Sequence, residues 1–293
     1  ENVNHPPVLL RLEMPEGGIE TFEARPCDPA PYQTGAKASI DFTDPVRGGV
    51  LKFQNGGVYG RRLDGRLVSG FNPAATPVLQ FRYRGDSMAN VSLALGPYAF
   101  TFSEVFNTHV RFGEGKAAVM DNTWRVWTGI PFDSVGQFPL AQRTTVPPGD
   151  IRIASRQDRD QTGLHSALSI DDVACGPAVG PNRPFAFKAD YADPDGVAEV
   201  AYAVLDGPAA VDNRTEAEKQ KAVWVPVKNA EVAQPDLTKL GDGFHHLLVR
   251  ARDSRGLWSD PADLPFICDR VPPKVTAAVT PTDKYNGSCL SLT

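Results

Sequence analysis

The sequence lacks several features that would assign it to common functional classes. It has no run of about eighteen apolar residues, so we expect no membrane insertion. Its 30 basic and 35 acidic residues are interspersed and give a formal net charge of −5, which argues against nucleic acid or an anionic membrane as partner. The chain begins at Glu1 without methionine or a signal peptide's apolar segment. We therefore expect that a leader was removed or that this is a piece of a longer protein.

Catalytic motifs are also missing. The sequence contains no GxSxG, no HExxH and no phosphate-binding glycine loop, and its five histidines stand without acidic residues at metal-ligand spacing. His245 and His246 are neighbours on one expected strand, so we expect at most one to point inward. The chain is predicted not to be an enzyme, with an accessory region of an enzyme as the alternative. A glycosidase needs only two carboxylates across a cleft, so a polysaccharide-active hydrolase remains the second alternative.

Cysteine is scarce. The four cysteines, Cys27, Cys175, Cys268 and Cys289, are too far apart for a CxxC zinc site. Their even number allows two disulfides in any of three connectivities, which would imply an exported protein. Four buried free thiols are the alternative.

Glycine and proline, by contrast, are abundant, with 26 of each. They bound many short runs rich in Val, Thr and Phe, a pattern that predicts an all-β protein. The clearest runs lie within residues 71–95, where two alternating segments flank a Gly-Asp-Ser turn and predict a β-hairpin with one buried face. The tetrapeptide Arg84-Gly85-Asp86-Ser87 at its tip spells a cell-adhesion motif, but these residues are also typical of a tight turn.

A proline- and glycine-rich connector near residues 175–184 divides the chain. We expect a linker over 1–17 that leads into one edge strand, and a two-sheet antiparallel β-sandwich over 18–177. A second sandwich of immunoglobulin-like size is expected over 178–271, and the start of a further module or a tail over 272–293.

Two sets of motifs resemble known families. Phe22-Glu23, TPVLQFRY at 76–83, Trp124 and IDDV at 170–173 occur in the order found in jelly-roll modules of the carbohydrate-binding and MAM type, with fewer cysteines than MAM. The stretch 243–273 resembles the closing half of immunoglobulin-like or fibronectin-like modules repeated in large secreted bacterial proteins. The resemblance implies an antiparallel jelly-roll β-sandwich followed by an immunoglobulin-like β-sandwich, in a secreted or cell-surface bacterial protein.

The jelly-roll resemblance also implies a metal site, because such folds often hold a structural calcium between the first and last strands. Glu23 and one of Asp171 and Asp172 would supply the carboxylate oxygens that Ca²⁺ prefers. Neighbours on a strand point to opposite faces, so only one of the two aspartates would join the site. The alternative is that these carboxylates accept backbone hydrogen bonds at strand ends.

The same resemblance implies a disulfide between Cys27 and Cys175, since it places the first strand beside the last. Cys268 and Cys289 would then form the second pair.

Aromatic side chains near loops are the candidate ligand-binding residues, because sugar rings stack on Trp and Tyr. The candidates are Tyr59, Tyr98, Phe106 and Trp127, each of which could instead pack in the core or at its rim. Trp124 and Trp127 have opposite parity on one expected strand, so one should face the core and the other should face outward or a neighbouring sheet edge.

These features predict a non-catalytic carbohydrate-binding or surface-recognition region of an exported multimodular protein, with a glycan or a cell-surface protein as partner. A structural or adhesive spacer of a cell-surface protein is the first alternative.

Overall fold

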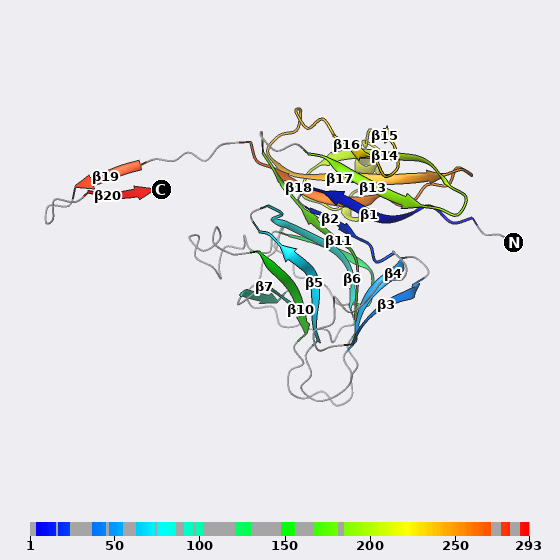
Figure 1. The fold of residues 1–293 in the computed structure, drawn as a ribbon, viewed down its shortest axis with the longest axis horizontal. Helices are drawn as coiled ribbons and strands as arrows, with labels where there is room; N and C mark the ends of the chain where they lie inside the picture. The colour runs from blue at the N-terminus through cyan, green and yellow to red at the C-terminus, as the bar shows by residue number, and fades with distance from the viewer. Residues whose placement is uncertain are drawn as a thin grey trace.

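The protein is all-β, built mostly of antiparallel sheets (Figure 1). The computed structural model describes residues 4–15, 17–23, 37–44, 47–54, 63–73, 75–85, 91–95, 98–101, 121–129, 148–155, 167–180, 185–270, 277–281 and 288–292. In these ranges the helical segments are the 3-10 turn η4 (Val211–Asn213) and the short helix α1 (Glu216–Lys219). No helix in the described part is long and apolar enough to cross a membrane.

The largest sheet has nine strands and runs in the order β16-β13-β1-β2-β11-β4-β3, while β6 pairs with β11 and β9 pairs with β6. Its strands are β1 (Val8–Met14), β2 (Gly17–Glu20), β3 (Lys37–Asp44), β4 (Gly48–Gln54), β6 (Val78–Gly85), β9 (Arg125–Gly129), β11 (Ala167–Gly176), β13 (Phe187–Ala192) and β16 (Val232–Ala233).

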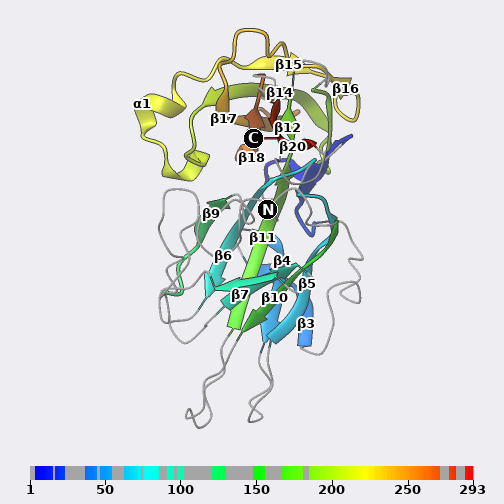
Figure 2. The ribbon, with the colours of Figure 1, turned by 90° about the vertical axis from the view of Figure 1, so that its left-hand side faces the viewer.

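Two further sheets pack against the two ends of this long sheet (Figure 2). One has the order β5 (Leu63–Phe71), β10 (Gly149–Ser155), β7 (Val91–Leu95), β8 (Tyr98–Thr101). The other has the order β12 (Ala178–Val179), β18 (Ala262–Cys268), β17 (Gly243–Asp253), β14 (Val197–Asp206), β15 (Val225–Val227). A separate hairpin contains β19 (Ala277–Pro281) and β20 (Ser288–Leu292). We call β2–β11 the inserted module, and β1 with β12–β18 the carrier module.

Strand β1 belongs to the carrier module, although it precedes the inserted module in sequence. It pairs with β13 from Val8 to Glu13. Leu12, 1% exposed, joins a core that includes Phe187, Tyr191 and Val249. The prediction of a linker over residues 1–17 is therefore wrong for 8–14. Burial of its leucines against β13 makes this segment a strand with a neighbour on each side.

Two glycines allow the tight step from β1 to β2. Gly17 has φ +127°, and a Cβ there would lie 2.3 Å from the carbonyl oxygen of Cys175 on β11. Gly18 has φ +151°, and a Cβ there would lie 2.4 Å from the carbonyl oxygen of Leu12 on β1. Only glycine tolerates both the backbone angles and the close approach, so the sheet can continue from one module into the other.

The predicted hairpin within residues 71–95 is wrong in its pairing. Both of its strands form, as β6 and β7, but β6 pairs with β11 and β9 while β7 pairs with β10 and β8 in the other sheet. Strand β6 is buried at nearly every position, because it is a central strand between two neighbours. Residues 86–90, which hold the end of the adhesion-like tetrapeptide, lie outside the described residues.

The chain enters and leaves the carrier module at opposite ends. Near the entry, Asn4 Nδ2 donates to Asp253 Oδ2 at 2.8 Å, at the last residue of β17. At the exit, Cys268 pairs with Gly243, the first residue of β17. The inserted module projects to one side of this path (Figures 1 and 2).

Candidate functional site

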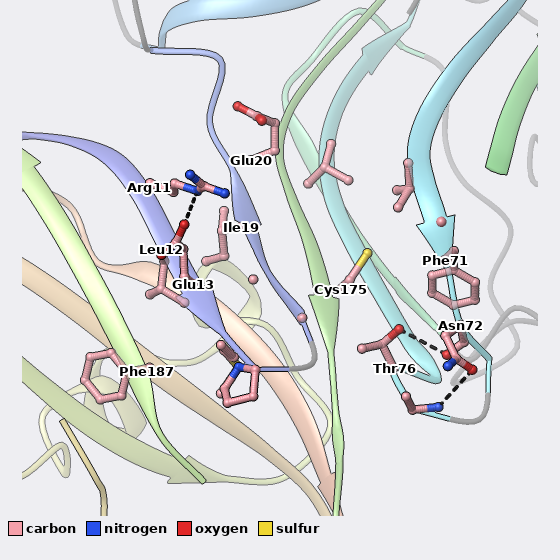
Figure 3. A pocket seen from close by; sticks show the side chains of 18 of the residues that line it. Arg11, Leu12, Glu13, Ile19, Glu20, Phe71, Asn72, Thr76, Cys175 and Phe187 are labelled. Carbon is pink, nitrogen blue, oxygen red and sulfur yellow. Dashed lines mark hydrogen bonds and ion pairs between the residues drawn. The ribbon is translucent and has the colours of Figure 1, made fainter. Parts of the chain in front are cut away.

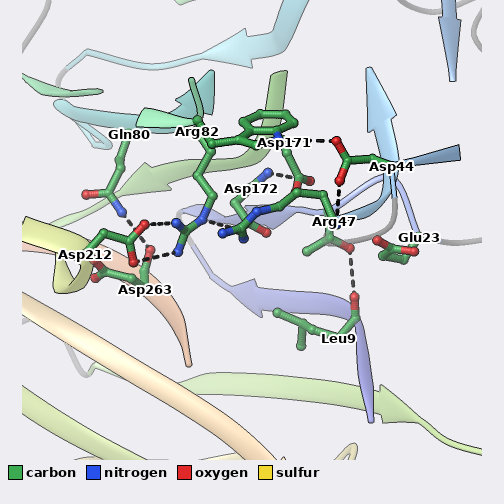
Figure 4. Close-up of polar contacts among 12 residues, drawn as sticks. Leu9, Glu23, Asp44, Arg47, Gln80, Arg82, Asp171, Asp172, Asp212 and Asp263 are labelled. Atoms are coloured by element: carbon green, nitrogen blue, oxygen red, sulfur yellow. Dashed lines mark hydrogen bonds and ion pairs between the residues drawn. The ribbon is translucent and has the colours of Figure 1, made fainter. Parts of the chain in front are cut away.

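Glu23, Asp171 and Asp172 lie in one region of the sheet, where the charges of Glu23 and Asp172 both act on the Asp171 carboxyl (Figure 4). Strand β11 pairs with β4 up to Ile170 and with β2 from Val173, so the two aspartates occupy the change of neighbour. Asp172 has φ 48°, which marks a bulge there. Glu23 follows β2, and its Oε1 accepts the Gly49 N–H at 2.9 Å.

Arginine side chains supply the positive charge at this cluster. Asp172 Oδ2 accepts from Arg82 Nε at 2.7 Å and from Arg47 Nη1 at 3.5 Å. Asp171 is 3% exposed, and its Oδ1 accepts the Asp172 N–H at 2.8 Å. Burial, with the nearby charges of Asp172 and Glu23, raises the pKa of Asp171 well above its usual range. Within the described residues, no group of three or more His, Cys, Asp or Glu is placed to hold a metal ion, and calcium stays a prediction.

Arg82 also connects the two modules. Its guanidinium pairs with Asp212 of η4, where Nη2 lies 3.3 Å from Oδ1. Beside it, Gln80 Nε2 donates to the carbonyl oxygen of Asp263 on β18 at 3.0 Å, and its Oε1 accepts from Thr128 Oγ1 at 2.6 Å. These polar contacts, of which the Gln80–Asp263 hydrogen bond is fully buried, fix the inserted module against the carrier module.

Asp263 anchors the carrier side of this contact. Its Oδ2 accepts the Val211 N–H at 2.9 Å, and its Oδ1 lies 2.7 Å from Nδ1 of His246. Burial favours the neutral form of Asp263, but the charge and hydrogen bond of His246, with the Val211 and Gln80 bonds, lower its pKa overall.

Both neighbouring histidines are buried, which corrects the expectation that at most one points inward. His245 is 4% exposed and His246 is 0% exposed. The two faces of β17 are both covered, one by the main carrier core and the other by a smaller cluster that includes Val211 and Trp224.

Trp127 is not an open binding platform. It is 5% exposed, and its ring packs against Phe81 with centroids 5.1 Å apart. Of the other predicted aromatic residues, Tyr59 and Phe106 lie outside the described residues, and for Tyr98 only the backbone, in β8, is described.

Trp124 is the outward member of the tryptophan pair, which agrees with the parity argument. It is half-buried, and its Nε1 donates to Asp44 Oδ2 at 3.2 Å. The Arg84 guanidinium lies 5.0 Å from the ring centroid and 3.2 Å from the same carboxylate. We call Asp44, Arg84 and Trp124 the Trp124 cluster. The opposite parity of Trp124 and Trp127 predicted that one of them faces outward, but the sequence does not show which of the two faces the core.

The residue that precedes Trp124, Thr123, belongs to an exposed turn held by hydrogen bonds. Asp121 Oδ1 accepts from the backbone N–H of Thr123 at 3.2 Å and from its hydroxyl at 2.6 Å. The Asn122 N–H donates to the Gly85 carbonyl at 2.7 Å. Thr123 is therefore held at the end of β6, beside Arg84, which orients the tryptophan.

The predicted disulfides do not form. Cys175 and Cys268 are free thiols, and each predicted pair contains one of them. Burial raises the pKa of the Cys175 thiol to about 12 and also raises that of Cys268. Cys268 ends β18 in the carrier module, whereas Cys289 lies in the separate β19–β20 hairpin. Cys27 lies outside the described residues.

A groove of about 910 Å³ lies between β5 and the β1–β2 hairpin (Figure 3). Arg11, Glu13, Glu20 and Lys188 place charges of both signs along it. The phenylalanines among its described lining residues, Phe71 and Phe187, are each 2% exposed, so they present no open face to a sugar.

No family model and no curated protein matches this chain. Among solved structures it is similar to a beta-glucuronidase of Faecalibacterium prausnitzii, with 10% identity and a TM-score of 0.19 over 96% of this chain and 47% of that one. This chain thus spans about half the length of that protein. It is also similar to the tripod from the baseplate of bacteriophage Tuc2009, with 13% identity and a TM-score of 0.21 over 94% of this chain and 100% of that one. Similarity at this level carries no functional argument.

Proposed function

We propose that this chain is a non-catalytic recognition region of an exported multimodular protein. In this proposal the inserted module is a jelly-roll sandwich that binds a glycan, and the carrier module is an immunoglobulin-like sandwich that positions it. The observation that carries the proposal is the Trp124 cluster, a half-exposed indole held between a carboxylate and a guanidinium. A fixed apolar ring beside hydrogen-bonding groups is what binding a sugar ring requires.

Affinity electrophoresis against a panel of polysaccharides tests this proposal. We expect at least one polysaccharide to retard the wild-type protein, and the Trp124→Ala variant to lose that retardation. Trp258→Ala is the matched control, because Trp258 also stacks on an arginine, Arg250 at 4.1 Å, but in the carrier module. Absence of retardation by every polysaccharide, or equal loss in both variants, would overturn the proposal.

A structural or adhesive spacer is the second candidate function. The opposite positions of chain entry and exit favour it, because modules connected in this way extend end to end. In that case the Trp124→Ala variant behaves like the wild type toward all polysaccharides, while deletion of the inserted module abolishes capture of a protein partner or assembly.

A further inference from the structure

We infer that the carrier module bears tension applied between the two ends of the chain and shields the inserted module from it. The inference rests on the spacer function proposed above. The chain enters the carrier module through β1 and leaves it through β18. Tension on the ends pulls β1 outward past the Asp253 end of β17 and pulls β18 outward past the Gly243 end.

Both strands are loaded lengthwise against their neighbours. β1 is antiparallel to β13, and β18 is antiparallel to β17. Hydrogen bonds in such ladders run across the strands, so pulling along a strand loads all of them together instead of one at a time. A strand loaded in this way resists separation more than one peeled from its end.

Side-chain contacts pin the chain where it enters and where it leaves. At the entry, Asn4 is bound to Asp253, which also accepts the backbone N–H groups of Arg255 and Leu257 at 2.9 and 2.7 Å. At the exit, the Arg270 N–H donates to Asp242 Oδ1 at 2.9 Å and its guanidinium donates to the Thr238 carbonyl at 3.1 Å. The outermost residues of the described carrier module are thus attached before the ladders begin.

The inserted module lies beside the path of the load. Its connections to the carrier, from β1 to β2 and from β11 to β12, are both at the exit end. Glu13 of β1 pairs there with Lys188, and Ala178 of β12 pairs with Ile267 of β18. While β1 stays paired with β13, tension passes across that ladder and not through the inserted strands. The inserted module can then keep its fold, and a site on it, under load.

The β1–β13 ladder is expected to yield first. It has five paired positions interrupted by a bulge between Leu9 and Arg11, whereas β17 and β18 pair at seven consecutive positions. Fewer bonds share the same load, so each one carries more of it.

Optical-tweezers extension of the full chain, with handles at its two ends, tests the inference. Apart from opening of the separate β19–β20 hairpin, which lies between the carrier module and the C-terminal handle, we expect the first unfolding event to release the carrier module, and the inserted module to open only afterwards. A Glu13→Cys/Lys188→Cys variant places a disulfide across paired positions of β1 and β13. Oxidation should remove that first event or move it to higher force, and reduction should restore it.

Tyr202→Cys/Val225→Cys is the matched control, because it cross-links paired positions of β14 and the edge strand β15, which lie off the load path. Its oxidised and reduced forms should give the same first event. Opening of the inserted module first in the wild type, or a first event unchanged by the Glu13–Lys188 cross-link, would overturn the inference. Neither result depends on glycan binding, so the recognition proposal stands or falls separately.

Discussion

At the scale of single residues, the glycines of the β1–β2 step have a measurable role. Gly17→Ala should destabilise the protein by about 3 kcal/mol, because the new Cβ meets a backbone carbonyl at 2.3 Å in a strained backbone conformation. Gly70→Ala is the control: its φ is +63°, but nothing lies within 4 Å, so the loss should be about 1 kcal/mol. Urea unfolding followed by tryptophan fluorescence measures both, and equal losses would contradict the argument.

Because of Asp263, the free energy of unfolding should decrease as the pH is lowered into the acid range. Its folded pKa is lowered, so the stabilisation that it contributes is complete above its unfolded pKa of about 3.9 and is lost as pH falls through the lower folded value. Asp263→Asn should therefore cost about 3 kcal/mol near neutral pH, because it leaves His246 without its charged partner.

Urea unfolding of both proteins across a range of pH measures this difference. The difference in free energy of unfolding between wild type and Asp263→Asn should become smaller as the pH falls below about 4. If this difference in free energy of unfolding does not change with pH, the carboxylate charge of Asp263 is not what stabilises the fold.

Calcium binding by Glu23 with Asp171 or Asp172 can be tested directly. On the jelly-roll resemblance, Ca²⁺ at about a hundred times its Kd should stabilise the wild type by about 2.7 kcal/mol relative to EGTA, which raises its Tm. Glu23→Gln should abolish the shift, because it removes one carboxylate ligand. Equal Tm values for the wild type in calcium and in EGTA would refute the site and leave Arg47 and Arg82 as the groups that neutralise the cluster.

At the scale of elements, β1 should be indispensable to the carrier module. Leu12→Ala should cost about 3 kcal/mol, since Leu12 is 1% exposed in the core shared with β13 and β17. Val8→Ala on the same strand is the control: Val8 is 41% exposed, and its loss should stay within about 0.5 kcal/mol. Chemical denaturation distinguishes the two. A linker would tolerate both substitutions equally.

At the scale of the whole molecule, the two modules should unfold together on heating, when no tension is applied to the chain ends. A continuous sheet and the buried side chain of Arg82, 8% exposed, join them. Arg82→Ala leaves Asp172 and Asp212 without a shared cation and should cost about 2 kcal/mol, a value discounted because Asp212 is partly exposed.

Differential scanning calorimetry measures this coupling. We expect one transition in the wild type and a broadened or divided transition in Arg82→Ala. Arg255→Ala is the control, because Arg255 pairs with Asp195 at the surface and contributes little. Two separate transitions in the wild type would contradict the coupling.

Local sequence patterns predicted the all-β class and many of the strands. Alternation of apolar and polar residues follows from the two-residue period of a strand, so β6, β7, β11 and β17 could be located from sequence alone. The opposite parity of Trp124 and Trp127 gave different environments for the same reason, half-buried for Trp124 and buried for Trp127.

Only the tertiary structure decided which strands pair. The sequence pattern predicted that β6 and β7 pair as a hairpin, but the two strands belong to different sheets. Strand β1 pairs with β13, which lies far along the chain. Periodicity fixes the face that a strand buries, whereas its partner depends on long-range contacts that no local pattern encodes. The sequence alone therefore determined strands and faces, and packing decided that β1 completes the carrier module and that Trp127 is buried while Trp124 is only half-buried.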